Sequence, residues 1–258
     1  MKQEIFFVNS FTDQVFSGNP AGVVFYDKEL SQNLMQKIAA ENNLSETAFI
    51  NLNSYEIRFF TPTIEVDLCG HATLASAFVF FKYIDDKSKE VRFKSKRGML
   101  TASEFNGKIE MDLPRDFPRE VKNKSLIQSA LNTNVKEAYK GIDDYMAIVE
   151  SEEDVLNLEL NFEIIETLDS RGLIVSSLGE DVDFVSRWFG PQTGVDEDPV
   201  TGSAHTLLTP FWAERLNKTE LSAKQLSRRG GELFCKLKEN SVSISGNASL
   251  YLRGEYFS

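Results

Sequence analysis

Two stretches of this chain repeat one pattern, and the fold is inferred outward from them. The first, residues 58–74, reads RFFTPTIEVDLCGHATL; the second, residues 187–208, reads RWFGPQTGVDEDPVTGSAHTLL. Each runs from an aromatic, strand-like segment through a proline turn and an acidic residue to a glycine, and then into an apolar segment of helical character. A glycine where a helix begins lets a ligand approach the backbone, and the helix dipole and free N–H groups there favour an anion. Two such helix starts predict a pseudo-symmetric protein that binds one carboxylate-bearing molecule between two halves.

Composition limits the class of protein. The chain has 258 residues, 41% of them hydrophobic, which suffices for one large domain or two of about 100–150 residues. A net charge of −11 argues against nucleic acid or an anionic membrane as a partner. Two cysteines are too few for a disulfide framework, no signal peptide is recognised, and the longest apolar run, residues 74–81, is too short to span a bilayer. We therefore expect a cytoplasmic protein with no nucleic-acid or membrane partner.

The order of strand-like and helix-like segments favours an α+β fold. Residues with helical spacing predict helices at 31–41, 71–83, 125–131, 152–158 and 203–216. Segments rich in Val, Ile and aromatic residues predict strands at 4–11, 22–26, 48–50, 55–60, 91–105, 108–113, 145–149, 162–167 and 173–176, and a strand meander over 232–257. The helix at 71–83 is apolar almost all round, and the helix at 203–216 is its counterpart, so both are expected to be buried.

The segment Pro114–Glu120 is the best candidate for a linker, because it holds two prolines and mixed charges. We expect an N-terminal domain over residues 1–114 and a C-terminal domain over residues 115–258, whose last strand can cross back to the first domain. Each domain is expected to wrap a curved, mostly antiparallel sheet around a central apolar helix. The active site is expected in the cleft between the domains.

Five blocks of the sequence resemble the phenazine-biosynthesis isomerase-like family, which is related in fold to diaminopimelate epimerase. The blocks are FVNSFT at 7–12, GNPA at 18–21, LSETAF at 44–49, CGHAT at 69–73 and EDPVTGSA at 197–204. The resemblance implies a diaminopimelate epimerase-like fold and a homodimer. It also implies a cofactor-free isomerase that moves a proton, and with it a double bond, within a small carboxylate-bearing molecule. The family's namesake substrate is a dihydro-hydroxyanthranilate ring.

The resemblance assigns three catalytic residues. Glu46 falls on the family's proton-shuttling glutamate; from local sequence alone it is one of 39 acidic residues, and a solvated side chain is the plainer interpretation. A carboxylate in an apolar pocket suits the role because one group can take a proton and return it. His71 falls on a histidine that contacts substrate, although a lone histidine is more often a core residue. Asp198 falls on a polar residue that orients the substrate or His71, although it could simply cap a helix.

The expected contacts with substrate lie mainly at the two helix starts. Ser203 is expected to offer its hydroxyl and N–H to the substrate carboxylate, and His205 is expected to pack in the core. Asn19 is either a substrate contact or a turn residue. The substrate-binding residues that the resemblance implies are Asn19, Gly70, His71, Ala72, Gly202 and Ser203. The sequence contains no Walker-type loop, dinucleotide-binding glycine motif or zinc motif, so we expect neither a cofactor nor a metal.

Cys69 distinguishes this chain from the related racemases and epimerases. In those enzymes two thiols precede the two glycines and act as opposed acid and base. Here Cys69 precedes Gly70, but Thr201 precedes Gly202, so stereoinversion by a thiol pair is not expected. An amino-acid racemase or epimerase with altered bases remains the second enzyme hypothesis. A metabolite-binding protein without catalysis is the third, and the candidate shuttle carboxylate argues against it.

Overall fold

The computed structural model describes residues 2–257. The chain forms two compact units: unit 1 contains the residues up to Asp112 and those from Ser245 onward, and unit 2 contains Leu113–Ile244. The chain enters unit 2 within strand β8 (Lys108–Pro114) and returns to unit 1 within strand β17 (Ser241–Gly246). Residues 245–257, which include the last strand that can cross back to the first domain, therefore group with unit 1.

Unit 1 contains a six-stranded, mostly antiparallel sheet in the order β18-β1-β2-β3-β4-β5. Strands β2 and β3 are parallel, while the other neighbouring pairs are antiparallel. Helix α1 makes the crossover that two parallel strands require. The bounds are β1 (Lys2–Ser10), β2 (Asn19–Tyr26), α1 (Gln32–Asn42), β3 (Glu46–Asn51), β4 (Ile57–Phe60), β5 (Glu65–Val66), α2 (Gly70–Val79), the π-helix η1 (Phe80–Ile84), β6 (Glu90–Ser95), β7 (Gly98–Phe105) and β18 (Ala248–Phe257).

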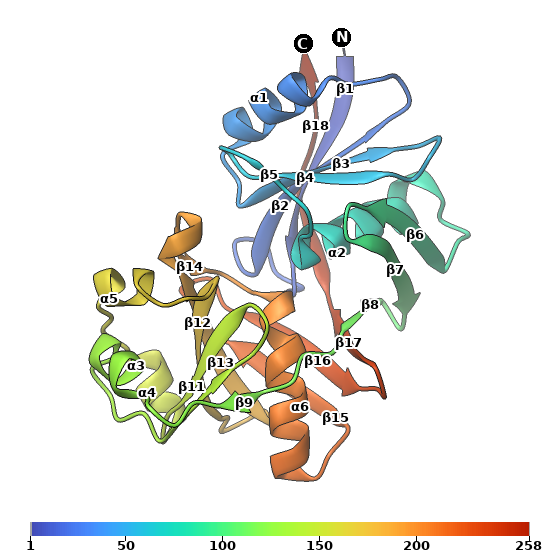
Figure 1. The fold of residues 1–258 in the computed structure, drawn as a ribbon. Helices are drawn as coiled ribbons and strands as arrows, with labels where there is room; N and C mark the ends of the chain where they lie inside the picture. The colour runs from blue at the N-terminus through green and yellow to red at the C-terminus, as the bar shows by residue number, and fades with distance from the viewer. Residues whose placement is uncertain (1, 258) are drawn as a thin grey trace. The chain divides into compact units, whose positions relative to one another are not determined.

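Helix α2 is the central helix of unit 1. Eight of its residues are buried, from His71 through Ala77 and then Val79. It contacts strands β1, β2, β3 and β7, and Figure 1 shows it running beneath the strands of the sheet. The burial predicted from its apolar sequence is confirmed, because a helix without a polar face has no favourable solvent-facing side.

Unit 2 contains a larger sheet in the order β17-β16-β15-β13-β12-β11-β10-β9, with β14 paired to β13. Strands β11 and β12 are parallel, as β2 and β3 are in unit 1. The bounds are β9 (Arg119–Glu120), α3 (Ser125–Ala130), β10 (Glu137–Lys140), β11 (Asp144–Ile148), α4 (Glu152–Leu156), α5 (Phe162–Glu166), β12 (Gly172–Leu178), β13 (Phe184–Gly190), η2 (Pro191–Thr193), β14 (Val195–Asp198), η3 (Gly202–Ala204), α6 (His205–Leu216), β15 (Glu220–Gln225) and β16 (Gly231–Leu237).

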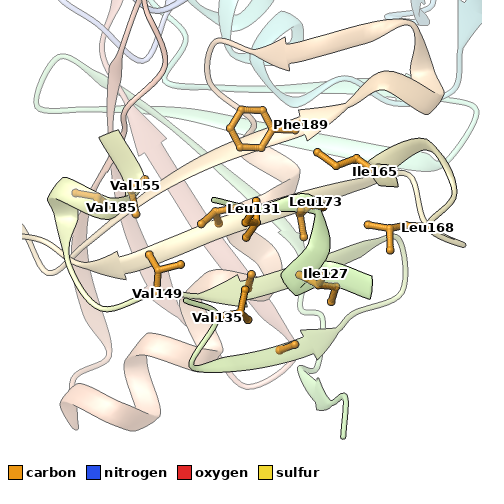
Figure 2. Packing of buried hydrophobic residues seen from close by; sticks show 14 residues of the cluster. Ile127, Leu131, Val135, Val149, Val155, Ile165, Leu168, Leu173, Val185 and Phe189 are labelled. Carbon is orange, nitrogen blue, oxygen red and sulfur yellow. The ribbon is translucent and has the colours of Figure 1, made fainter. Parts of the chain in front are cut away.

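Helices cover the sheet of unit 2. Helix α6, the counterpart of α2, contacts β15 and β16 and buries eight of its twelve residues. Helices α3, α4 and α5 pack against strands β10 to β13 in a separate apolar cluster. Figure 2 shows this cluster, in which Phe189 and Leu173 from the strands lie among aliphatic side chains from the three helices. Burial of such side chains is the main contribution to the stability of the unit.

Two predicted strands differ from the structure. Residues 91–105, predicted as one strand, form two antiparallel strands, β6 and β7. Residues 162–167 were expected to form a strand, but Phe162–Glu166 form the short helix α5. The side chain of Asn161 accepts a hydrogen bond from the N–H of Ile164, which caps the helix. Phe162 and Ile165 are three residues apart and both pack into the same cluster, which is the spacing of a helix and not of a strand.

The two repeated stretches adopt the same local structure. In unit 1, Arg58 on β4 makes two hydrogen bonds of 2.8 Å to Glu65 on β5, and its guanidinium lies 5.2 Å from the Phe60 ring. In unit 2, the equivalent hydrogen bonds measure 2.7 and 3.1 Å and the guanidinium lies 5.0 Å from the ring. The counterparts there are Arg187, Glu197 and Phe189. Pseudo-symmetry therefore extends from the sequence pattern to individual side-chain contacts.

The helices of residues 2–257 include none that is both long and apolar enough to cross a membrane. Helix α6, the longest of the mainly apolar ones, has only twelve residues, against the roughly 20 that a membrane span requires.

Candidate active site

Three secondary-structure elements of unit 1 begin at one place and bring three of the predicted site residues together. Asn19 is the first residue of β2, Glu46 is the first residue of β3, and His71 lies in the first turn of α2. Because β2 and β3 are parallel neighbours, their first residues lie close together at the same end of the two strands. The Ser10 hydroxyl donates a 2.7 Å hydrogen bond to the carbonyl of His71 and so ties the start of α2 to the end of β1.

The imidazole of His71 lies between a carboxylate and an amide. Its Nε2 is 3.1 Å from Oε2 of Glu46, and its Nδ1 is 3.1 Å from the side-chain nitrogen of Asn19. If the Asn19 amide nitrogen donates to Nδ1, the ring is neutral and its single N–H proton lies on Nε2, facing Glu46. If the ring is doubly protonated, Nδ1 is itself a donor, and the Asn19 side chain must turn its amide oxygen toward it. Asn19 is fully buried, whereas the Glu46 side chain is 19% exposed. Glu46 is therefore the member of this group that a molecule outside the protein can reach.

Cys69 is the fourth polar residue at the start of α2. Its Sγ lies 3.5 Å from Nδ1 of His71 and 3.9 Å from Nε2. Burial, together with the nearby charge of Glu46, raises the pKa of the Cys69 thiol to about 11, although His71 acts in the opposite direction. The thiol is therefore protonated near neutral pH. This contradicts the acidified cysteine that a helix start would favour on its own.

His71 responds to two opposing effects. Burial lowers the pKa of His71, but negative charge on Cys69 and Glu46 raises it by more. The pKa of His71 therefore lies well above the ordinary value of 6.5. Since the Cys69 thiol is neutral near pH 7, the negative charge that stabilises the imidazolium there is the carboxylate of Glu46. The start of α2 thus places the His71 imidazolium beside the side chain of Glu46.

The same residues are the only group of metal-ligand side chains found among residues 2–257. One ligand atom each from Glu46, Cys69 and His71 lies within 4.8 Å of the others. Carboxylate, thiolate and imidazole are all ligands that zinc accepts. Binding a metal there would first require the Cys69 thiol and the His71 imidazolium to lose protons. The expectation of a metal-free protein stays a prediction.

In unit 2, Asp198 lies beside Thr201, the residue that replaces the second cysteine of the related racemases. The Thr201 hydroxyl donates a 2.6 Å hydrogen bond to Oδ2 of Asp198. The side chain of Gln225 binds both residues: its oxygen accepts from the N–H of Thr201 at 2.8 Å, and its nitrogen donates to the carbonyl of Asp198 at 2.8 Å. These bonds fix the segment that leads into the second helix start, where Gly202 and Ser203 form the first residues of η3.

Ser203 has a partner that the sequence did not indicate. Nη1 of Arg171 donates a 2.8 Å hydrogen bond to the Ser203 hydroxyl. Arg171 lies 32 residues earlier, in the loop before β12. A single arginine in a polar loop carries no pattern, so only the three-dimensional structure could find this contact.

His205 packs in the core, as expected. It is fully buried, its Nδ1–H donates to the carbonyl of Thr201 at 2.9 Å, and its ring centroid lies 5.8 Å from that of Phe184. Burial lowers the pKa of His205 to about 4, although the bond to Thr201 acts in the opposite direction. The two histidines of the chain are therefore held in opposite charge states near neutral pH.

The predicted site residues divide between the two units. Asn19, Glu46, Gly70, His71 and Ala72 belong to unit 1. Asp198, Gly202 and Ser203 belong to unit 2. Within each unit the structure brings the polar candidates to a helix start. Their joint action on one substrate remains a prediction.

Comparison with known proteins identifies the family. The sequence profile of the family described as "Phenazine biosynthesis-like protein" matches residues 8–254. The chain belongs to this family. An uncharacterized isomerase of Pseudomonas aeruginosa is 45% identical over 256 residues, which cover 98% of each chain. The human phenazine biosynthesis-like domain-containing protein is 39% identical over 287 residues, which cover 98% of this chain and 99% of the relative.

Solved structures of the phenazine biosynthesis-like family confirm the fold. The crystal structure of a phenazine biosynthesis protein of the PhzF family from Enterococcus faecalis matches with a TM-score of 0.97 and 44% identity, over 100% of both chains. A probable proline racemase from Agrobacterium radiobacter shares the fold alone, with a TM-score of 0.66 and 9% identity, over 99% of this chain and 93% of the racemase. The expected α+β, diaminopimelate epimerase-like fold is thus confirmed, and the relatives place this chain in an isomerase family.

Proposed function

We propose that this protein is a cofactor-independent isomerase that moves a proton, and with it a double bond, within a small carboxylate-bearing molecule. Glu46 is the proton shuttle of this proposal. The observation that carries it is the 3.1 Å contact between Oε2 of Glu46 and Nε2 of His71, at the start of a buried helix. Membership of the phenazine biosynthesis-like family, which includes relatives named as isomerases, supports the same conclusion.

The proposed reaction uses one carboxylate twice. The Glu46 carboxylate removes a proton from one carbon of the substrate, the electron pair left behind shifts the double bond, and the protonated Glu46 returns the proton to a second carbon. His71 lies 3.1 Å from this carboxylate and positions it for the transfer. A single group that acts as base and then as acid conserves the proton and needs no external oxidant or reductant.

The proposed substrate carries a carboxylate because both helix starts favour an anion. The N–H groups in the first turn of a helix have no intrahelical acceptor, and the helix dipole adds partial positive charge there. Gly70, with His71 and Ala72 after it, and Gly202, with Ser203 after it, stand at these positions. We propose that Asn19 and Asp198 complete the recognition of the substrate, as the family resemblance implies.

The proposal is tested by incubating the purified protein with cyclic carboxylates, including the dihydro-hydroxyanthranilate, in buffered heavy water. Proton NMR should show a product of the same formula with a shifted double bond, deuterated at the newly protonated carbon to the extent that Glu46 exchanges with solvent. Proline and hydroxyproline enantiomers serve as the comparison. Exchange of an α-proton with loss of optical activity would replace the isomerase proposal with a racemase. A panel that is bound but left unchanged would indicate a binding protein.

We also propose a homodimer, an expectation that rests on the family resemblance alone. Light scattering on the purified chain should give twice the mass of the 29.2 kDa protomer. A monomer would remove this expectation without affecting the chemistry, since Glu46 and His71 belong to one chain.

A further inference from the structure

A charged network reaches the second helix start from the loop before β12. The guanidinium of Arg171 donates from Nε to one oxygen of Asp144 at 3.1 Å and from Nη2 to the other oxygen. Its remaining nitrogen, Nη1, donates to the hydroxyl of Ser203 at 2.8 Å. Asp144 is 4% exposed and has Arg171 as its ion-pair partner. The rigid fork of the guanidinium therefore fixes Ser203 with respect to a buried carboxylate.

This hydrogen bond determines where Ser203 directs its own proton. A serine hydroxyl has one hydrogen and two lone pairs. Because Arg171 is a donor only, the Ser203 oxygen accepts from it, and the hydroxyl hydrogen remains to be donated to another group. The carbonyl of Ser203 is already the acceptor of a 2.7 Å hydrogen bond from Thr206. Ser203 is thereby prepared to donate to an acceptor in front of the helix start, and Arg171 strengthens it as a donor by polarising the oxygen.

Arg171 lies one residue before the position in unit 2 that corresponds to Glu46 of unit 1. In unit 1, Thr47 on β3 pairs with Phe60 on β4; in unit 2, Leu173 on β12 pairs with Phe189 on β13. Phe60 and Phe189 are counterparts, so Thr47 corresponds to Leu173. Glu46, the residue before Thr47, therefore corresponds to Gly172. Arg171 is the next residue back along the chain.

The same correspondence relates the two helix starts, because His71 follows Gly70 as Ser203 follows Gly202. A residue at the start of the equivalent strand therefore contacts the equivalent helix start in each unit. In unit 1 that residue is the acid Glu46, and in unit 2 it is the base Arg171. The two helix starts are thus contacted by side chains of opposite charge, which lie one position apart in the pseudo-symmetric alignment.

The surroundings of Arg171 are built to hold it. Its guanidinium carbon lies 5.2 Å from the centroid of the Trp188 ring system. A Cβ added at Gly172 would lie 2.6 Å from this indole, and one added at Gly190 would lie 2.1 Å from it. Only glycine at both positions leaves room for the indole on which Arg171 stacks.

We propose that Arg171, held by Asp144, is the positioning residue that makes unit 2 select a carboxylate, acting through the hydroxyl of Ser203. The inference rests on the proposed function and adds to it a positioning residue of unit 2, because Arg171 orients the Ser203 hydroxyl that is proposed to meet the anionic group. The ligand class is a small ring that bears a carboxylate, as opposed to its uncharged amide.

The test measures binding, so that it does not depend on turnover. The probes are 3-hydroxyanthranilate, an aromatic ring with no double bond to move, and its carboxamide, each titrated by calorimetry. Wild type should prefer the carboxylate. Arg171→Met and Ser203→Ala should each weaken carboxylate binding by roughly 10- to 100-fold, the range for a hydrogen bond to a charged group, and leave amide binding unchanged. The double variant should lose little more than either single one, because both remove the same contact.

Arg187 provides the matched control. It also pairs with a glutamate through two hydrogen bonds and lies over an aromatic ring, but its Nη1 donates to the carbonyls of Val155 and Leu156 instead of a helix-start residue. Arg187→Met should therefore leave the preference for carboxylate over amide unchanged. If Arg171→Met does not fold because Asp144 is left buried without its partner, Arg171→Met with Asp144→Asn removes both charges. Arg171→Lys keeps the charge but loses the fork, and should show an intermediate preference.

The outcomes separate this inference from the proposed function. A folded Arg171→Met protein that keeps the wild-type preference overturns the inference, as does an equal loss in Arg187→Met. A wild type that binds neither probe, or binds both equally, overturns it as well. A preference that depends on Arg171 in a protein that isomerises nothing supports the inference and rejects only the proposed function.

Discussion

The carboxylate of Glu46 lies 3.1 Å from the imidazole of His71, and the two side chains come from the starts of a strand and a helix. The sequence separates them by 25 residues, so the pair is a product of the fold. Cys69 does not compete with Glu46 for the imidazolium of His71. Burial raises the pKa of the Cys69 thiol to about 11, so the thiol is neutral at pH 7. The pair is the centre of the proposed chemistry, and the predictions below test it.

The charge on His71 should depend on Glu46. The chain has two histidines, so nitrogen-detected NMR can follow both without ambiguity. We expect the pKa of His71 to lie well above 6.5, because burial, which lowers it, is outweighed by nearby negative charge. Glu46→Gln should lower the pKa of His71, and Cys69→Ser should change it little. The opposite pattern, with the large change in Cys69→Ser, would mean that a thiolate and not a carboxylate stabilises the imidazolium.

The same pair sets part of the pH dependence of stability. The pKa of His71 is raised in the folded state, so its contribution is present below pH 6.5 and is lost as the pH rises through the folded pKa. The denaturant midpoint of wild type should therefore decrease as the pH rises above 6.5. The midpoint of Glu46→Gln should decrease less over the same range. Chemical denaturation at a series of pH values measures this, and parallel curves for the two proteins would contradict it.

His205 should act in the opposite direction. Burial lowers the pKa of His205 to about 4, so its contribution is present above pH 6.5 and is lost as the pH falls from 6.5 to about 4. The loss should be on the order of 3 kcal/mol, since each pKa unit corresponds to about 1.4 kcal/mol. His205→Phe should unfold with a weaker pH dependence between pH 6.5 and 4 than wild type. An unchanged slope would show that His205 is charged in the folded protein.

Cys69 should be dispensable for catalysis. Thr201, whose hydroxyl donates to Asp198, stands where a second thiol would be needed, and burial keeps Cys69 protonated. Cys69→Ala should therefore retain most of the isomerase rate, and Cys235→Ala, which removes a second buried thiol, is the control for packing loss. Complete loss of activity in a folded Cys69→Ala protein would revive the racemase hypothesis.

Activity should survive metal chelation. Glu46, Cys69 and His71 could together hold an ion, but the proposed role needs protons at His71 and Cys69 that a metal would displace. Dialysis against EDTA should leave the rate unchanged. A rate that falls on dialysis and returns with added Zn²⁺ would make this group a metal site and replace the proton-shuttle proposal.

Much of the fold was accessible from the sequence because its signals are local. Asn106 and Gly107 both adopt positive φ angles in the β7–β8 turn, as an Asn-Gly hairpin signal predicts. The Ser31 hydroxyl caps α1, as a serine just before a run of helical spacing indicates. The failure at residues 162–167 came from a segment of only five residues, too short for periodicity to separate a helix from a strand.

The site was accessible only in part. The helix starts carry a sequence pattern, so Gly70, His71, Gly202 and Ser203 could be located and their secondary structure predicted. The contact between Glu46 and His71 depends on the parallel pairing of β2 with β3, which no local pattern encodes. Arg171 and Asp144 were missed altogether, because an arginine before one strand and an aspartate at the start of another carry no local pattern that distinguishes them from ordinary surface residues.

The most direct test of the central claim is the turnover of a cyclic carboxylate by wild type and Glu46→Gln under identical conditions. Glutamine keeps the size of the side chain but cannot accept the proton, so folding and ligand binding should be nearly unchanged. The rate should fall by at least roughly 10²–10⁴-fold, the range for loss of a general acid–base group. A Glu46→Gln protein that turns over at the wild-type rate would remove Glu46 from the mechanism and contradict the assignment of this chain as a proton-shuttling isomerase.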